Sequence, residues 1–312
     1  MAEEPLGAPS DGDHLFQLIP LPDGRKEFYT TRPQRPFPSY TIADVVMSRL
    51  ARYVAGAHHS GATTLANWIG ALITALFALF AQSGWCQEAL PSEFVRLREI
   101  APLIREDIRY AGPFNFTGYI VPGYQRADCI AWDRAAKALA RAQNRLLTEG
   151  FELKVYDCYR PLRAVRAFVA WSKSPGHDAM KSIFYPSLDK SKLFELGFIS
   201  LHSRHRMGIA VDVGLVRIRD DDIAPSKPSG RCDGPFEQRV NESSLDFGTA
   251  YDCFSDLSAT ASPNISATAR ANRERLRRAL ETEGFRNYSR EWWHYDFTGS
   301  SVPTQAYDFP VR

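Results

Sequence analysis

The sequence predicts an α+β fold: a single domain in which helices flank a small mixed or antiparallel sheet, preceded by an export segment. Three observations support this prediction. A stretch with apolar residues at helical spacing is followed at once by an alternating stretch that is typical of a strand. Later helices and strands follow one another without the regular rhythm of strand–helix–strand units. Near the N-terminus, a long uncharged apolar run differs in composition from the rest of the chain.

The first helix and strand of the folded part are the clearest elements. Over Asp133–Glu149 apolar residues recur at helical spacing, and Gly150 is a natural helix stop. Residues 151–157 then alternate in the manner of a strand. A second helix is expected from Pro161 to about Ser172, because proline is favoured in the first turn of a helix.

The later elements are shorter and less regular. A third helix is expected from about Ala269 to Glu283, and strands at about Ile209–Val216 and Trp292–Phe297. Residues 217–263 are rich in charge, Pro and Gly, which predicts a long surface loop. A loop of this length within a compact domain is usually functional or mobile.

The charge of the chain excludes some classes of function. The chain has 312 residues, and apolar residues make up 44% of it, enough to bury a sizeable core. The formal net charge is only +2. We expect no nucleic acid as a partner, because proteins that bind nucleic acids usually show a basic face. The composition is also not that of a disordered chain.

The N-terminal part has the composition of an export segment. Residues 1–46 are rich in Pro, Gly and charge, which indicates a disordered tail or an over-extended start. Residues 47–86 contain the apolar run Leu65–Ala81 after a basic start at Arg49, and Met47 is an alternative first residue. This order is typical of a secretory signal peptide. An uncleaved membrane anchor and a buried core helix are the alternatives.

Cleavage at Ala81-Gln82-Ser83 would leave a mature domain over residues 88–312. We therefore expect an exported protein of the periplasm or cell envelope, which contacts a membrane only if the apolar run is not removed. The cysteines after that run fit export. We expect Cys129 to pair with Cys158 and Cys232 with Cys253, only because each pair spans a short stretch of chain. Free buried thiols are the alternative.

Two of the histidines after the apolar run, His205 and His294, lie in densely polar segments. A single histidine is more often structural than metal-binding. Asp212 is a stronger signal, because a carboxylate in an apolar strand is unfavourable unless it is paired or metal-bound. Catalytic zinc takes three nitrogen or carboxylate ligands and keeps an open position. A bend at Gly208 would let His205 and Asp212 face one metal, which His294 would complete.

Glu291 lies shortly before His294. A carboxylate beside a catalytic zinc, but not bound to it, is the usual base for activating water. The alternation of side chains along a strand would put Glu291 and His294 on opposite faces. A bend or bulge between them is therefore expected.

The motifs Ser-x-His-x-x-Gly-x-Ala-x-Asp (203–212) and Glu-x-x-His (291–294) together resemble a family of zinc peptidases. This family includes D-Ala-D-Ala carboxypeptidases and D-alanyl-D-alanine dipeptidases, and the resemblance to the dipeptidases is closer. It runs from about Ile108 to the C-terminus and takes in Asp157-Cys158-Tyr159-Arg160-Pro161 and Tyr307-Asp308-Phe309-Pro310-Val311.

The resemblance implies a zinc dipeptidase domain over residues 88–312, with one zinc ion per chain and a role for each matching residue. The implied zinc ligands are His205, Asp212 and His294. Glu291 would be the general base and acid, and Arg160 would stabilise the oxyanion. The implied substrate-binding residues are Ser203, Asp252, Tyr110 and Tyr124, with Asp252 holding the substrate ammonium. A surface salt bridge or a helix-start contact for Arg160 and a turn or helix cap for Asp252 are the alternatives.

The implied activity is hydrolysis of D-Ala-D-Ala and similar small D,D-dipeptides. Two other functions fit parts of the pattern. One is a D,D-carboxypeptidase or endopeptidase acting on longer peptidoglycan stems, with the same zinc chemistry and a different pocket. The other is an inactive cell-wall binding module with a structural metal, which would need neither Glu291 nor Arg160.

Overall fold

The computed structural model describes residues 16–20, 26–30, 90–218, 230–239 and 242–312. The chain divides into two compact units, residues 1–87 and 88–312. The first contains an antiparallel hairpin of β1 (Phe16–Pro20) and β2 (Lys26–Thr30). The predicted export segment, residues 47–86, lies outside the described residues. None of the helices that the structure describes is long and apolar enough to cross a membrane.

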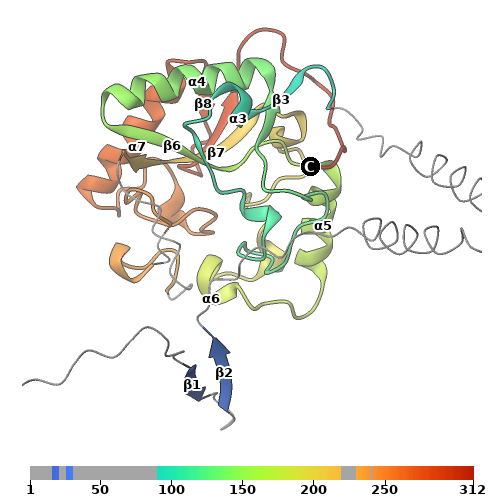
Figure 1. Ribbon diagram of the computed structural model, residues 1–312, viewed down its shortest axis with the longest axis vertical. Helices are drawn as coiled ribbons and strands as arrows, with labels where there is room; N and C mark the ends of the chain where they lie inside the picture. The colour runs from blue at the N-terminus through green and yellow to red at the C-terminus, as the bar shows by residue number, and fades with distance from the viewer. Residues whose placement is uncertain (1–15, 21–25, 31–89, 219–229, 240–241) are drawn as a thin grey trace, which may run out of the picture. The chain divides into compact units, whose positions relative to one another are not determined.

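The second unit is built on a mixed five-stranded sheet, as predicted (Figure 1). Its strands, in spatial order, are β4 (Arg105–Glu106), β6 (Phe151–Asp157), β7 (Ala210–Arg217), β9 (His294–Phe297) and β8 (Phe285–Asn287). β4 runs parallel to β6, and all other neighbours are antiparallel. β3 (Phe94–Arg96) and β5 (Ile130–Trp132) form a separate antiparallel pair.

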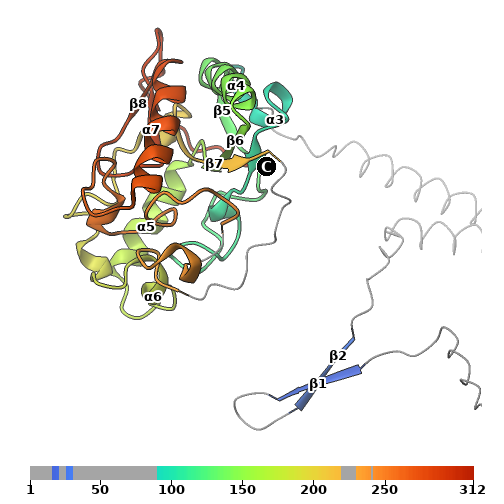
Figure 2. The same cartoon turned by 90° about the vertical axis from the view of Figure 1, so that its left-hand side faces the viewer.

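Two long helices pack against the sheet and against each other. α4 (Asp133–Thr148) contacts β6, and α7 (Ala267–Glu281) contacts α4 and β8 (Figures 1 and 2). α4 is amphipathic, and Leu139 and Leu146 are fully buried on its inner face. α5 (Leu162–Lys173) follows β6 closely, with α3 (Leu97–Ile100) and α6 (Lys181–Phe184) as short additions. The three predicted helices are thus present, which confirms the mixed α and β class.

The prediction of a surface loop over residues 217–263 is wrong for its second half. Phe247, Tyr251 and Phe254 are buried in the main core. Residues 219–229 and 240–241 lie outside the described residues. The charge, Pro and Gly that suggested a loop are concentrated before residue 236, whereas the later residues supply aromatic rings to the core.

The predicted strand over Trp292–Phe297 begins later, at His294. Trp292 and Trp293 lie in a turn and are buried. The backbone N–H of Trp292 donates to the carbonyl of Ser258, so it takes no part in the sheet ladder. Both expected cysteine pairs, Cys129–Cys158 and Cys232–Cys253, are disulfide-bonded.

Candidate active site

Strand register brings three polar residues into one row across the sheet. Asp157 on β6 is opposite Asp212 on β7, and Asp212 is opposite His294 on β9. Directly opposite residues on neighbouring antiparallel strands point to the same face. The pairing of β6 with β7 shifts between Val155 and Asp157, a bulge that adds one residue on β6. The shift places Asp157, the last residue of β6, beside Asp212.

His205 reaches this row from a turn just before β7. It lies in a short 3₁₀ turn, Arg204–Met207, and the Ser203 hydroxyl caps the turn by accepting a hydrogen bond from the His205 N–H at 3.3 Å. Gly208 ends the turn in the left-handed region, at φ 70°. A side chain at this position would come within 2.3 Å of the Phe94 ring. Only glycine therefore permits the bend that the sequence predicted here.

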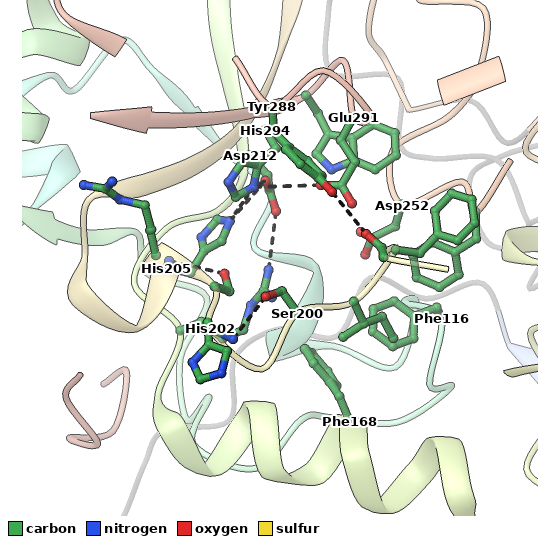
Figure 3. A pocket seen from close by; sticks show the side chains of 18 of the residues that line it. Phe116, Phe168, Ser200, His202, His205, Asp212, Asp252, Tyr288, Glu291 and His294 are labelled. Carbon is green, nitrogen blue, oxygen red and sulfur yellow. Dashed lines mark hydrogen bonds and ion pairs between the residues drawn. The ribbon is translucent and has the colours of Figure 1, made fainter. Parts of the chain in front are cut away.

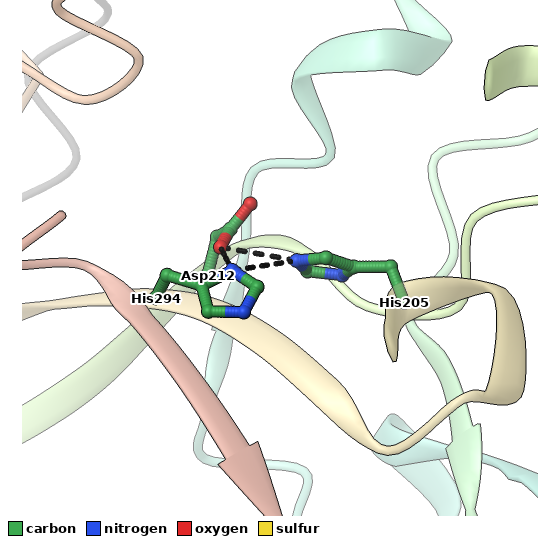
Figure 4. Close-up of side chains that lie close together, drawn as sticks. All are labelled: His205, Asp212 and His294. Carbon is green, nitrogen blue, oxygen red and sulfur yellow. Dashed lines mark hydrogen bonds and ion pairs between the residues drawn. The ribbon is translucent and has the colours of Figure 1, made fainter. Parts of the chain in front are cut away.

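Three side-chain atoms converge at one point (Figure 4). His205 Nε2 lies 3.2 Å from Asp212 Oδ1 and 3.2 Å from His294 Nδ1. His294 Nδ1 lies 3.0 Å from Asp212 Oδ1. His205 and Asp212 are buried, and His294 is half-buried. The structure thus brings together the three residues that the sequence predicted as metal ligands.

In each ring, the nitrogen that faces away from the other two residues, here called the outer nitrogen, has a partner of its own. His205 Nδ1 lies 2.6 Å from the carbonyl oxygen of Cys158, and His294 Nε2 lies 3.2 Å from Asp296 Oδ1. Both partners are acceptors, so we assign the ring proton to these outer nitrogens. In the neutral rings, the inner nitrogens then present lone pairs to each other and to Asp212. The repulsion between three such atoms is relieved either by a second proton on His294, whose pKa is raised to about 10 by its hydrogen bonds to Asp212 and Asp296, or by a metal ion that replaces that proton.

The donor set fits a zinc ion. Two imidazole nitrogens and one carboxylate oxygen are ligands that zinc commonly takes in catalytic sites. Zinc–ligand bonds of about 2.0–2.1 Å in a tetrahedron place neighbouring ligand atoms roughly 3.3 Å apart. The observed separations of 3.0–3.2 Å are close to that value. The outer contacts to Cys158 and Asp296 are of the kind that orients metal-binding histidines.

Glu291 lies beside these three atoms without being one of them. It precedes β9 in a turn, which supplies the predicted bend: the His294 N–H donates to the Glu291 carbonyl at 3.3 Å. Glu291 Oε2 is 3.9 Å from His294 Nδ1. Burial raises the pKa of Glu291 to about 7, with His294 opposing the rise and Asp212 adding to it. Such a carboxyl group can exchange a proton near neutral pH.

Arg160 lies just before α5, is buried, and reaches Asp212, one of the three converging residues. Its Nε and Nη2 lie 2.8 Å from Asp157 Oδ2, and Nη2 lies 3.5 Å from Asp212 Oδ2. The guanidinium also lies over the rings of Tyr110 and Phe168. Arg160 is therefore held in the site by a buried ion pair. The alternative reading as a surface salt bridge is wrong, because Asp157 is fully buried.

Asp252 lies across the cavity from the histidines. It has left-handed backbone, at φ 57°, a conformation that aspartate tolerates better than most residues. Its Oδ2 accepts a hydrogen bond from the Tyr110 hydroxyl at 2.8 Å. Burial, and then the charge of Asp212, raise the pKa of Asp252 well above its usual range. Among the described residues, no Lys or Arg forms a salt bridge with Asp252.

These groups line one cavity of about 310 Å³ (Figure 3). Glu291 and Asp252 lie near each other at one edge, and the rings of Phe116 and Phe168 form the wall below them. The predicted site residues that line the cavity are Tyr110, Arg160, Ser203, His205, Asp212, Asp252, Glu291 and His294.

Tyr124 is the exception among the predicted residues. Its hydroxyl donates to Asp157 Oδ1 at 2.6 Å, and the residue does not line the cavity. Tyr124 supports Asp157, which in turn holds Arg160, and its contact with substrate stays a prediction.

Three residues with contacts to the site were not predicted from the sequence. Asp157 holds Arg160, Asp296 holds His294, and the Tyr251 hydroxyl donates to Asp212 Oδ2 at 3.1 Å. Asp157 could have been found from the sequence, because it ends a predicted strand shortly before Arg160. Tyr251 and Asp296 gave no signal beyond their closeness in sequence to Asp252 and His294.

Comparison with known proteins agrees with this arrangement. A family model described as D-ala-D-ala dipeptidase matches residues 91–225 and 238–312. A curated D-alanyl-D-alanine dipeptidase from Enterococcus faecium is 32% identical over 219 residues, which are 70% of this chain and 98% of that protein. One from Streptomyces coelicolor is 30% identical over 222 residues, 71% of this chain and 100% of that protein. A third, from Escherichia coli, is 26% identical over 219 residues, 70% of this chain and 92% of that protein. With two thirds of its length matched in this way, the chain belongs to the D-Ala-D-Ala dipeptidase family of peptidases.

Proposed function

We propose that this chain hydrolyses D-Ala-D-Ala and similar D,D-dipeptides with one zinc ion held by His205, Asp212 and His294. The observation that carries the proposal is the convergence of three possible ligand atoms, two imidazole nitrogens and one carboxylate oxygen, beside Glu291 in a cavity that also holds Asp252. The names of the relatives support the choice of substrate. A zinc ion bound there would polarise the peptide carbonyl and lower the pKa of the attacking water.

Glu291 is the proposed general base and acid. It lies within reach of the three converging atoms but is not one of them, so its carboxylate is free to accept a proton. It takes the proton of the water that attacks the peptide carbonyl and then donates it to the leaving amine. Its pKa of about 7 suits both directions of transfer.

Arg160 is the proposed oxyanion donor. Its contacts with Asp157 and Asp212 are made by Nε and Nη2. Among the described residues, Nη1 forms no hydrogen bond or ion pair with another side chain. Nη1 can therefore donate to the oxygen that becomes negatively charged when water attacks. One preorganised donor of this kind is worth about 3–4 kcal/mol in the barrier.

Asp252 is the proposed partner of the substrate ammonium. A buried carboxylate without a nearby cation is unfavourable, and a positively charged ligand group would relieve this. Tyr110 fixes the orientation of Asp252 through its hydroxyl. Ser203 lines the same cavity and is proposed to contact the substrate as well. A longer peptide has an amide in place of this ammonium and would leave Asp252 unpaired.

The test uses purified, zinc-loaded protein and three substrates: D-Ala-D-Ala, N-acetyl-D-Ala-D-Ala and a peptidoglycan stem peptide. Free alanine should be released from the dipeptide only, and a chelator should stop the release. Cleavage of the acetylated dipeptide at an equal rate would point to the carboxypeptidase function. Retention of zinc without any cleavage would point to a binding module. Asp252→Asn should weaken dipeptide hydrolysis while zinc binding is kept.

We also propose that the enzyme works outside the cytoplasm, in the periplasm or cell envelope. Two disulfides support this, because disulfides persist in oxidising compartments and are rare in the cytosol. The basic and apolar pattern of residues 47–86 supports it independently.

A further inference from the structure

We propose that Tyr251 is a positioning residue for Asp212. Its hydroxyl donates to Oδ2, the outer oxygen of that carboxylate, so that Oδ1 faces the two histidines. Arg160 then remains available to the substrate. This inference rests on the proposed function, since it assigns Tyr251 a part in the same zinc site.

The two oxygens of Asp212 have separate partners. Oδ1 lies 3.2 Å from His205 Nε2 and 3.0 Å from His294 Nδ1. Oδ2 points away from them, to the Tyr251 hydroxyl at 3.1 Å and to Arg160 Nη2 at 3.5 Å. The phenol contact is the shorter one. A carboxylate whose outer oxygen is held in this way offers one oxygen to a metal rather than two.

The protons of the neighbouring phenols can be assigned. The Tyr110 hydroxyl donates to Asp252 at 2.8 Å, so its single proton is used there. The hydroxyls of Tyr251 and Tyr110 are 3.4 Å apart, a longer distance than that from Tyr251 to Asp212. Each phenol has one proton, and each of these two carboxylates receives a hydrogen bond from one phenol. Tyr251 therefore donates to Asp212, a proposed metal ligand, while Tyr110 donates to Asp252, the proposed partner of the substrate ammonium.

The ring of Tyr251 is held on several sides, so its hydroxyl has one position. It is fully buried and stacks on Tyr156, with centroids 4.5 Å apart and planes 9° apart. It also forms a T-shaped contact with Trp293, with centroids 5.6 Å apart. Its backbone N–H donates to Glu242 Oε2 at 2.9 Å, and Glu242 pairs with buried Arg109 at 3.2 Å. Rigid outer partners of this kind orient metal ligands.

The position of Tyr251 also affects Arg160. If the phenol is removed, the outer oxygen of Asp212 loses its nearest donor, and Arg160 is the remaining group that can approach it. An arginine drawn onto Asp212 would be displaced from the carbonyl of the substrate. Loss of the hydroxyl should then lower zinc affinity and kcat together, with less effect on KM.

The experiment compares Tyr251→Phe with Tyr156→Phe. Both remove one buried phenolic oxygen from the same stacked pair, but only the first removes a hydrogen bond to Asp212. Zinc affinity is measured by competition with a chelating dye. We expect Tyr251→Phe to lower it by roughly 10–100-fold. The absorption spectrum of the cobalt-substituted protein should also change, because it reports the binding mode of the carboxylate. Tyr156→Phe should leave both measurements near wild type.

A general loss of packing is distinguished by melting each variant with and without zinc. A structural role would lower Tm equally in both states, whereas a role towards the metal reduces the rise in Tm that zinc produces. If Tyr251→Phe matches Tyr156→Phe in affinity, spectrum and zinc-induced Tm rise, the inference is wrong and the proposed function stands. If the wild type neither binds zinc nor cleaves D-Ala-D-Ala, the proposed function itself fails.

Discussion

At the scale of single residues, the cavity has an excess of acidic groups. Four carboxylates line it, against two arginines, of which Arg160 is already paired with Asp157; the lining residues are Asp212, Asp252, Glu291 and Asp296, with Arg160 and Arg204. Burial raises the pKa of Asp252 and of Glu291, because a buried carboxylate loses its hydration, and Arg160 only partly opposes the rise. A metal ion at the histidines and an ammonium at Asp252 would both supply the missing positive charge. The two proposed ligands of the cavity are thus complementary to its charge.

Replacing Glu291 with Gln separates metal binding from proton transfer. The amide has a similar size but cannot accept the proton of water, so kcat should fall by at least roughly 100-fold. Zinc content, measured by atomic absorption, should stay near one per chain because Glu291 is not among the three converging atoms. In the wild type, activity should be lost on the acid side as Glu291 becomes protonated; its pKa is about 7 without metal, and the charge of a bound zinc ion would move the loss to lower pH. Near-normal turnover in Glu291→Gln would assign the base elsewhere.

The protonation of His294 predicts how zinc affinity depends on pH. Burial by itself would lower the pKa of His294, but hydrogen bonds to Asp212 and Asp296 raise it to about 10. Zinc must displace that proton, so its apparent affinity should rise about tenfold per pH unit between about pH 7 and pH 9. Asp296→Ala removes one acceptor and should make this dependence shallower. A zinc affinity that is independent of pH in this range would contradict the assignment.

At the scale of elements, strand register and one turn assemble the site. Asp157, Asp212 and His294 become neighbours through the pairing of β6, β7 and β9. His205 joins them because the 3₁₀ turn ends at Gly208, where the chain reverses direction against Phe94. A change in the backbone of this turn should therefore affect metal binding, although Gly208 contacts no ligand atom.

The prediction for this turn compares Gly208→Ala with Gly150→Ala. Both glycines have positive φ, but a side chain at Gly150 meets no atom within 4 Å, whereas one at Gly208 would collide with Phe94. Gly150→Ala should cost about 1–2 kcal/mol from backbone conformation alone. Gly208→Ala should cost about 1–3 kcal/mol more from overpacking, and should also weaken zinc binding. Thermal melting and chelator competition measure the two effects. Equal losses of stability in the two variants would show that the contact with Phe94 is not decisive.

At the scale of the whole molecule, both disulfides connect to the site. Cys158 is bonded to Cys129, and its carbonyl accepts from the outer nitrogen of His205. Cys232 is bonded to Cys253, the residue after Asp252. The covalent links thus restrain segments that carry a proposed metal ligand and the proposed ammonium partner. Such links are expected to form in an oxidising compartment.

Export predicts the form in which the protein occurs in its cell. The mature chain should begin after about residue 81 and should be recovered outside the cytoplasm with both disulfides formed. N-terminal sequencing of protein purified from cell fractions, with mass measurement before and after reduction, tests this. Recovery of a chain with an intact Met1 from the cytoplasmic fraction would contradict export. An intact apolar run in the membrane fraction would favour an anchor instead.

The sequence by itself determined the three longer helices, the strands over residues 151–157 and 209–216, and the residue types available for chemistry, but not the short strands β3, β4, β5 and β8. The helix and strand around Gly150 follow from local periodicity, and the segments around His205, Glu291 and Arg160 follow from motifs. These features could be predicted because helical spacing, strand alternation and glycine or proline at element ends are properties of neighbouring residues.

Only the tertiary structure decided which oxygen of Asp212 faces the histidines and which tyrosine donates to which carboxylate. It further decided that the Tyr124 hydroxyl donates to Asp157. It also decided that residues 247–254, expected within a surface loop, belong to the core. The physical reason is that these contacts join segments far apart in the chain. Their distances depend on strand register, a bulge and ring packing, and none of these is encoded in the spacing of residues along the sequence.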